Sequence, residues 1–127
     1  MANRLPAARR WLLPVLLLGG LLIAAPLATA QTHLAGTAGP GSMYEVDVPA
    51  VWNGDLVVYA HGIVQADEPL APPAAQDGYD AFRTALLGAG YAVAASSFSS
   101  NGWSLDDAVR RTHQLSGLFT SRIGKPR

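Results

Sequence analysis

The stretch Leu56-Val57-Val58-Tyr59-Ala60-His61-Gly62 decides the fold of this chain more than any other segment. It begins with a short apolar run rich in valine, which predicts a strand buried on both faces. Gly62, at the carboxyl end of this run, predicts a sharp turn that points amide hydrogens into a crevice. Open α/β sheets bind ligands in such a crevice, so the stretch predicts both an α/β fold and the place of its site.

The residues before this stretch predict one further strand. Residues 43–48 alternate apolar and charged side chains, which is typical of a strand with one solvent-exposed face. Asn53-Gly54 is a tight-turn dipeptide, so we expect this edge strand to pair antiparallel with residues 56–60. Residues 31–42 are rich in Gly, Ala and Thr and predict an extended lead-in.

A loop rich in proline and alanine follows His61-Gly62, and a helix and a strand come next. We expect Asp77 or Asp80 to cap this helix and Gly90 to close it. The helix would present four apolar side chains on one face: Tyr79, Phe82, Leu86 and Leu87. Residues 91–97 predict a buried strand, and the intervening helix favours parallel pairing with residues 56–60.

A second helix is predicted over residues 105–122. Ser104 is a typical N-cap residue, and Asp106 and Asp107 suit the first turn of a helix. Apolar side chains then recur at helical spacing as far as Phe119, and Gly124 and Pro126 end the helix. The predicted order is therefore strand, strand, helix, strand, helix.

The first 30 residues predict a secretory signal peptide. Three arginines (Arg4, Arg9 and Arg10) precede an apolar segment over residues 11–25, and Ala28-Thr29-Ala30 provides the small residues of a cleavage site. Cleavage after Ala30 would leave residues 31–127 as a secreted or periplasmic domain with no stable membrane span. The alternative is an uncleaved segment that anchors the chain in a membrane.

Charge and cysteine content exclude several classes of function. Three of the nine basic residues lie in the predicted signal, which leaves six basic residues against nine acidic ones. This mildly acidic balance argues against a nucleic-acid partner. The chain has no cysteine, which excludes disulfides, a thiolate nucleophile and a cysteine zinc site. Its three histidines (His33, His61 and His113) show no metal-ligand spacing, so we expect neither a metal nor another cofactor.

His61-Gly62 is the leading candidate for chemistry. An amide N–H just after a strand, that of Ile63 above all, would be placed to stabilise the charge that develops on a carbonyl oxygen during acyl transfer. The alternative is a plain turn whose histidine bonds to the backbone. We therefore name His61, Gly62 and Ile63 as oxyanion-hole candidates.

From Tyr44 onward the chain resembles the first half of an α/β-hydrolase, in particular the secreted bacterial serine esterases and peptidase-like members. Residues 56–62 match the third strand with its oxyanion turn, and residues 87–94 match a helix end that enters the fourth strand. Residues 101–104, the following helix and residues 124–127, which lead toward the nucleophile strand, complete the match. The resemblance implies an α/β-hydrolase-type sheet that is incomplete and ends before the nucleophile elbow.

The family's nucleophile stands in a Gly-x-Ser-x-Gly elbow, and no serine of this chain has that setting. Gly102-Trp103-Ser104-Leu105-Asp106 comes nearest but ends in an aspartate. We therefore expect no catalytic residue within this chain, and we name Ser97, Ser99 and Trp103 as pocket-lining candidates in the complete fold.

Two functions remain open from the sequence. The first is the amino-terminal part of an exported serine hydrolase that acts on a small-molecule or peptide-like acyl substrate and is inactive alone. The second is a small exported binding or scaffold module without catalysis, which would have to protect the exposed edges of its sheet.

Overall fold

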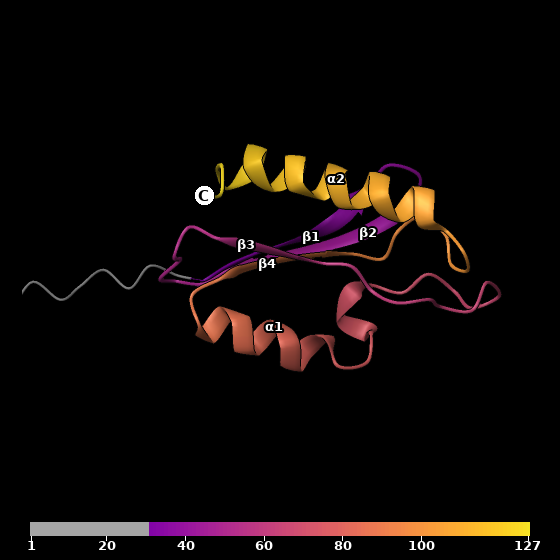
Figure 1. Ribbon diagram of the computed structural model, residues 1–127, viewed down its shortest axis with the longest axis horizontal. Helices are drawn as coiled ribbons and strands as arrows, with labels where there is room; N and C mark the ends of the chain where they lie inside the picture. Colours follow the sequence, from indigo (N-terminus) through magenta and orange to yellow (C-terminus); the bar gives the residue numbers. More distant parts are fainter. Residues whose placement is uncertain (1–30) are drawn as a thin grey trace, which may run out of the picture.

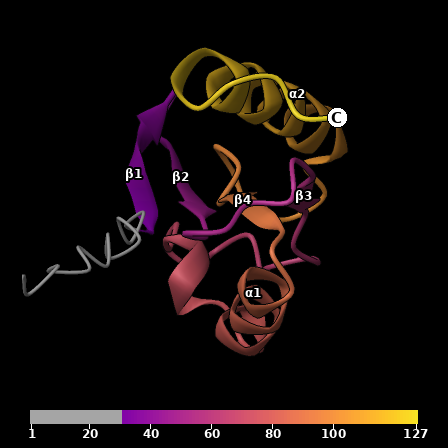
Figure 2. The ribbon, with the colours of Figure 1, turned by 90° about the vertical axis from the view of Figure 1, so that its left-hand side faces the viewer.

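The computed structural model describes residues 31–127, so the signal-peptide prediction lies outside the described residues. The described part is an α/β fold in which one mixed sheet lies between two helices, one on each face (Figures 1 and 2). Its elements, in chain order, are β1 Thr32–Ala38, β2 Ser42–Val48, β3 Leu56–Tyr59, the short 3₁₀ turn η1 Pro73–Ala75, α1 Tyr79–Gly88, β4 Ala92–Ser96 and α2 Leu105–Arg122.

The four strands lie in the order β1-β2-β4-β3. β3 and β4 are parallel, with Val57 opposite Val93, and α1 connects them. This confirms the parallel pair predicted from a helix between two apolar runs. β1 and β2 are antiparallel neighbours, and β2 in turn pairs antiparallel with β4.

The predicted hairpin between β2 and β3 is wrong, because β4 lies between these two strands. The tight turn exists: Gly54 has φ +96°, and the Asp55 N–H donates to the Asn53 side chain over 2.9 Å. However, the Asn53 N–H donates to the Gly90 carbonyl over 2.9 Å, which ties the turn to the segment that enters β4. The turn therefore places β3 on the side of β4 that is opposite to β2.

β2 is an inner strand and not the predicted edge. The segment predicted as an extended lead-in contains β1, which covers the outer side of β2 from Thr32 to Ala38. β3 is in turn an edge strand of the described sheet, and its four residues are half-buried where the sequence predicted burial on both faces.

The charged side chains of β2 are buried, which corrects the prediction of one solvent-exposed face. Asp47 is only 1% exposed and accepts hydrogen bonds from His33 at 2.9 Å and from Arg83 at 3.1 Å. Glu45 is also buried and accepts a bond from the Ala74 N–H in η1 over 3.3 Å. The carboxylates stay buried because β1, α1 and η1 bring hydrogen-bond donors to them.

The core forms two clusters, one on each face of the sheet. Under α2, Phe119 and Leu115 pack on Val46 and neighbouring strand residues, and Trp52 meets the Phe119 ring at 5.6 Å. Under α1, Tyr79 packs with Val93, Ala95 and the half-buried Tyr59. The predicted apolar face of the first helix is thus confirmed for Tyr79, Leu86 and Leu87, which all pack in this cluster, whereas Phe82 lies at its exposed margin.

Both helices begin without the side-chain caps that the sequence predicts. Gly78 is the N-cap of α1, in the left-handed region at φ +75°, so neither Asp77 nor Asp80 caps it. Ser104 does stand at the N-cap of α2, but its hydroxyl donates to the Ser100 carbonyl over 2.8 Å. The extent of α2, residues 105–122, is confirmed.

The amino-terminal half of α2 leaves its apolar stripe uncovered. Leu105 is 67% exposed and Val109 is 70% exposed, although both belong to the helical repeat that continues to the buried Phe119. Among residues 31–127, no helix has the length and apolar character needed to span a bilayer.

Candidate functional site

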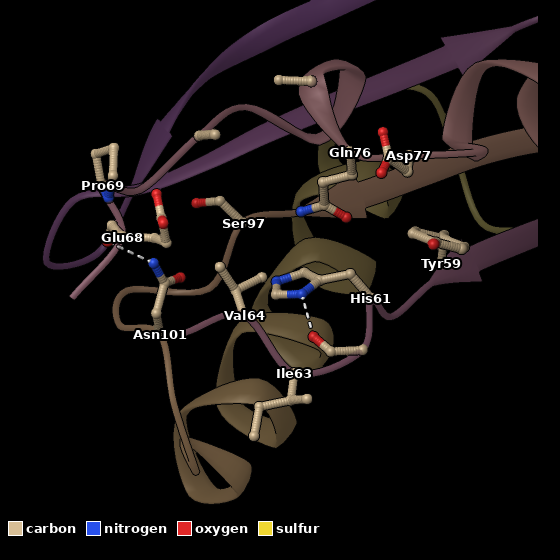
Figure 3. A pocket seen from close by; sticks show the side chains of 13 residues that line it. Tyr59, His61, Ile63, Val64, Glu68, Pro69, Gln76, Asp77, Ser97 and Asn101 are labelled. Carbon is tan, nitrogen blue, oxygen red and sulfur yellow. Dashed lines mark hydrogen bonds between the residues drawn. The ribbon is translucent and has the colours of Figure 1, made fainter. Parts of the chain in front are cut away.

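The candidate site lies beyond the carboxyl ends of the parallel strands β3 and β4, where open α/β sheets bind ligands. The loop after β3 and the loop after β4 are tied together there. The Gly102 N–H donates to the Val64 carbonyl over 2.8 Å. The Asn101 amide donates to the Glu68 carbonyl over 2.8 Å (Figure 3). These two bonds fix the mouth of a pocket between the loops.

His61 projects from the first of these loops into the site (Figure 3). Its Nδ1 lies 2.7 Å from the Gly62 carbonyl oxygen. Because a carbonyl oxygen only accepts, Nδ1 carries the hydrogen, and in the neutral ring Nε2 is an unprotonated acceptor. Nε2 is buried and has no hydrogen-bond partner within residues 31–127. This nitrogen is therefore an unpaired atom enclosed by the protein.

Phe98 supports the His61 ring and is a site residue that the sequence analysis missed. The two rings are stacked with centroids 4.1 Å apart and planes 25° apart. Phe98 has φ +58°, a left-handed conformation that is rare for a bulky side chain. The Ser96 hydroxyl accepts from its N–H at 3.1 Å, and the Ser97 hydroxyl donates to its carbonyl at 2.8 Å. The only sequence signal was a phenylalanine among the serines that end the fourth strand.

The amides that follow His61 are free to donate. Neither the Gly62 N–H nor the Ile63 N–H donates a hydrogen bond in the part of the chain that the structure describes. Ile63 is 65% exposed, so this residue lies at the surface and not in the packed interior. Gly62 does not adopt the positive φ that a strained turn would require, which corrects its predicted role. A Cβ at Gly62 would meet no atom within 4 Å, so its backbone borders open space.

Two pockets meet at His61, Gly62 and Ile63. The first, called the polar pocket below, has a volume of about 450 Å³, and its lining mixes apolar residues with polar ones, which include Glu68, Gln76, Asp77 and Ser97. The second has a volume of about 280 Å³ and is mostly apolar, with Phe98, Trp103 and Leu105 in its walls. Both volumes are near the lower end of the range of small-molecule sites.

The pocket-lining candidates are divided between these spaces. Ser97 lines the polar pocket and Trp103, which is 86% exposed, lines the apolar one. Ser99 lines neither of them: its N–H donates to the Asp107 carboxylate over 2.5 Å, and its hydroxyl is buried and unpaired within residues 31–127. Asp107 also bonds Arg111 at 3.2 Å, so this aspartate holds the loop after β4 against α2.

The remaining polar candidates lie elsewhere. His113 is exposed on α2, and His33 bonds Asp47 on the far strands of the sheet. In the described residues, no group of three or more His, Cys, Asp and Glu side chains could hold a metal ion. Within residues 31–127, the Ser97 and Ser104 hydroxyls bond only to backbone groups, so no histidine or carboxylate there is arranged to activate either serine.

Comparison of the chain with protein-family models, with curated proteins and with solved structures found no match.

Proposed function

We propose that residues 31–127 form the amino-terminal part of an exported serine hydrolase and contribute half of its oxyanion hole. The observation that carries this proposal is the free Ile63 N–H, which belongs to the loop after β3 and borders two pockets. In α/β-hydrolases one oxyanion donor comes from the loop after the third strand, and the other from the residue after the nucleophile. The strand order and the parallel β3–β4 pair are compatible with this placement.

The outer edge of β3 supports the same proposal. β3 pairs only with β4 within the described residues. After α2 the chain returns to this edge, where the Arg127 N–H donates to the Gly54 carbonyl over 2.9 Å and its guanidinium meets Asp55 at 3.1 Å. A strand that continued from this point would lie beside β3, which is where the resemblance expects the strand that leads to the nucleophile.

The test is a protein that continues through the downstream reading frame past a Gly-x-Ser-x-Gly elbow and includes the acid and histidine of a triad, which follow the serine in this family. We expect a fluorophosphonate serine probe to label it and p-nitrophenyl esters to be hydrolysed, while residues 31–127 alone give neither signal. An extended protein that stays unlabelled would overturn the hydrolase proposal.

Replacement of Ile63 isolates the proposed donor in that extended enzyme. Ile63→Pro deletes the N–H, and we expect kcat to fall by about 10²–10³, the usual cost of losing one oxyanion donor. Ile63→Ala keeps the N–H and removes an exposed side chain, so it serves as the matched control with kcat nearly unchanged. Equal rates in the two variants would exclude this amide from the oxyanion hole.

A non-catalytic exported binding module is the second candidate. It is favoured by the two core clusters, which already cover both faces of the sheet within residues 31–127. A cooperative melt followed by circular dichroism and a monodisperse peak in size-exclusion chromatography would support the module. Aggregation through the open β3 edge would support the incomplete hydrolase.

A further inference from the structure

The peptide unit between Gly62 and Ile63 carries both the carbonyl that His61 contacts and the N–H proposed as an oxyanion donor. This unit is planar and trans, so its C=O and N–H point in opposite directions and turn together. No atom of the described residues lies within 4 Å of the place where a side chain of Gly62 would stand. A peptide plane beside such a glycine rotates easily, because glycine adopts conformations that other residues avoid. A further contact is therefore needed to fix the direction of the N–H.

His61 makes that contact. Its Nδ1 lies 2.7 Å from the Gly62 carbonyl oxygen (Figure 3). The hydrogen belongs on Nδ1, because an unprotonated Nδ1 would face the lone pairs of the carbonyl. A hydrogen on the enclosed Nε2 would have no acceptor within the described residues. The bond from Nδ1 thus fixes the Gly62 carbonyl and, through the peptide plane, the direction of the Ile63 N–H.

Phe98 holds the His61 ring in place for this bond. The Phe98 side chain is buried, and its ring stacks on one face of the imidazole with the ring centroids 4.1 Å apart. The Nε2 edge of the imidazole is enclosed, and the Nδ1 edge is bonded to the Gly62 carbonyl. With one face and both of these edges in contact, the imidazole keeps a single orientation.

The serines at the end of β4 fix Phe98 in turn. Its left-handed backbone, at φ +58°, is unfavourable for a bulky residue. Such conformations persist only where neighbours over-determine them, and they cluster at functional sites. The Ser96 hydroxyl accepts from the Phe98 N–H at 3.1 Å and lies 2.7 Å from the Ser42 hydroxyl of β2. The Ser97 hydroxyl donates to the Phe98 carbonyl at 2.8 Å and accepts from the Met43 N–H at 2.9 Å. Both serines therefore tie Phe98 to an inner strand of the sheet.

We propose that His61 is a positioning residue whose ring, held against Phe98, binds the Gly62 carbonyl and thereby directs the Ile63 N–H. The use of this N–H as an oxyanion donor rests on the proposed function, whereas its orientation by His61 does not. His61 acts through the backbone and transfers no proton, because Nδ1 is engaged and Nε2 is enclosed.

Nitrogen-15 NMR of the full chain tests the orientation directly. At about pH 9, where histidine is neutral, the His61 ring should show the tautomer with its hydrogen on Nδ1. The residual dipolar coupling of the Ile63 amide, which reports the average direction of its N–H, should fit the structure. It should shrink in His61→Phe, which keeps a ring against Phe98 and loses the donor. His113→Phe, the same change at an exposed histidine of α2, is the matched control. A hydrogen on Nε2, or an unchanged coupling in His61→Phe, would overturn the proposal.

Two amide variants separate the Nδ1 donor from the rest of the ring. His61→Asn places a side-chain N–H near the position of Nδ1, and His61→Gln places it near the position of Nε2. We expect the Ile63 coupling to recover in His61→Asn and to stay averaged in His61→Gln. The opposite order would contradict the assignment of Nδ1.

Phe98→Asn tests the stack. Asparagine tolerates the left-handed region, so the variant keeps the backbone turn and loses the ring. We expect the Ile63 coupling to shrink while the circular dichroism of the sheet and helices is retained. An unchanged coupling in a folded Phe98→Asn protein would exclude Phe98 from the orientation of His61.

In the extended enzyme the same variants separate kcat from KM. A misdirected donor weakens only the transition state, so His61→Phe should lower kcat and kcat/KM together by about tenfold or more, and His61→Asn should recover most of the loss. A change confined to KM would contradict the positioning role. The expected NMR result with an unlabelled extended protein would keep this role and remove the hydrolase. A labelled enzyme with an unchanged Ile63 coupling in His61→Phe would do the reverse.

Discussion

Replacing Tyr79 with phenylalanine should stabilise this protein, although the side chain is fully buried. The Tyr79 ring packs under α1 and lies 5.1 Å from the ring of Tyr59, and phenylalanine keeps these contacts. Its hydroxyl is buried and has no hydrogen-bond partner within the described residues. A buried, unpaired hydroxyl costs about 1–3 kcal/mol, so we expect Tyr79→Phe to add about 1 kcal/mol to the free energy of unfolding.

The same residue makes stability depend on pH in the alkaline range. Burial raises the pKa of Tyr79, the negative charges of Glu45 and Asp47 raise it further, and Arg83 only partly opposes them. The folded state therefore keeps the phenol protonated, while the unfolded chain ionises it near pH 10 as a free tyrosine does, at a pKa of about 10. The contribution of the protonated Tyr79 to stability is therefore complete below about pH 10. Above that pH the free energy of unfolding falls by up to about 1.4 kcal/mol per pH unit.

Urea unfolding and thermal melts, both followed by circular dichroism at pH 7 and at pH 10.5, measure both effects. At pH 7 a gain of about 1 kcal/mol raises Tm by roughly 4–8 °C for a domain of this size. At pH 10.5 the advantage of Tyr79→Phe should widen. Tyr59→Phe is the control, because the Tyr59 hydroxyl is not among the buried unpaired atoms. A loss of stability in Tyr79→Phe at pH 7 would refute the reasoning, since it would mean that the hydroxyl has a partner.

Three further predictions concern the packing that supports the site. Phe119→Ala should cost about 3–5 kcal/mol in urea unfolding, because the ring is fully buried against β2 and Trp52; a cost below 1 kcal/mol would mean that α2 does not pack there. Asp47→Asn should lower the free energy of unfolding by about 2 kcal/mol, because it weakens the bonds from His33 and Arg83. Asp80→Asn, at a side chain that is 69% exposed, should lower it by less than about 1 kcal/mol in the same assay. Gly117→Ala, within α2 and with free space around it, should raise the free energy of unfolding by about 0.5–1 kcal/mol. Gly90→Ala should lower it by about 1 kcal/mol, because Gly90 has φ +87° and a Cβ there would meet the Val51 carbonyl at 3.3 Å. Thermal melts that rank these two variants in the opposite order would contradict both assignments.

The charge of Arg83 does not change over the pH range of the Tyr79 experiment. Burial lowers the pKa of this guanidinium, but the hydrogen bonds and charges of Asp47 and Asp80 outweigh burial and raise it overall. Arg83 therefore stays charged throughout the range in which the Tyr79 experiment is made.

The local pattern of residues by itself determined most of the elements of this protein. Apolar runs and helical spacing were enough to place β3, β4 and the full length of α2, and a helix between two apolar runs was enough to make β3 and β4 parallel. The position of His61 and Ile63 just after β3 followed from the same pattern, because a strand end depends on residues close in sequence.

Which strands pair was decided only by the tertiary structure. Asn53-Gly54 forms its turn as its residues demand, yet β3 pairs with β4 and not with β2, and a local turn carries no information about that choice. The burial of Asp47 depends likewise on donors that arrive from β1 and α1, and the stacking of His61 on Phe98 depends on two loops separated by a helix and a strand. Contacts between distant segments fix the partners of a side chain, whereas the periodicity around it fixes only its local conformation and the face on which it lies.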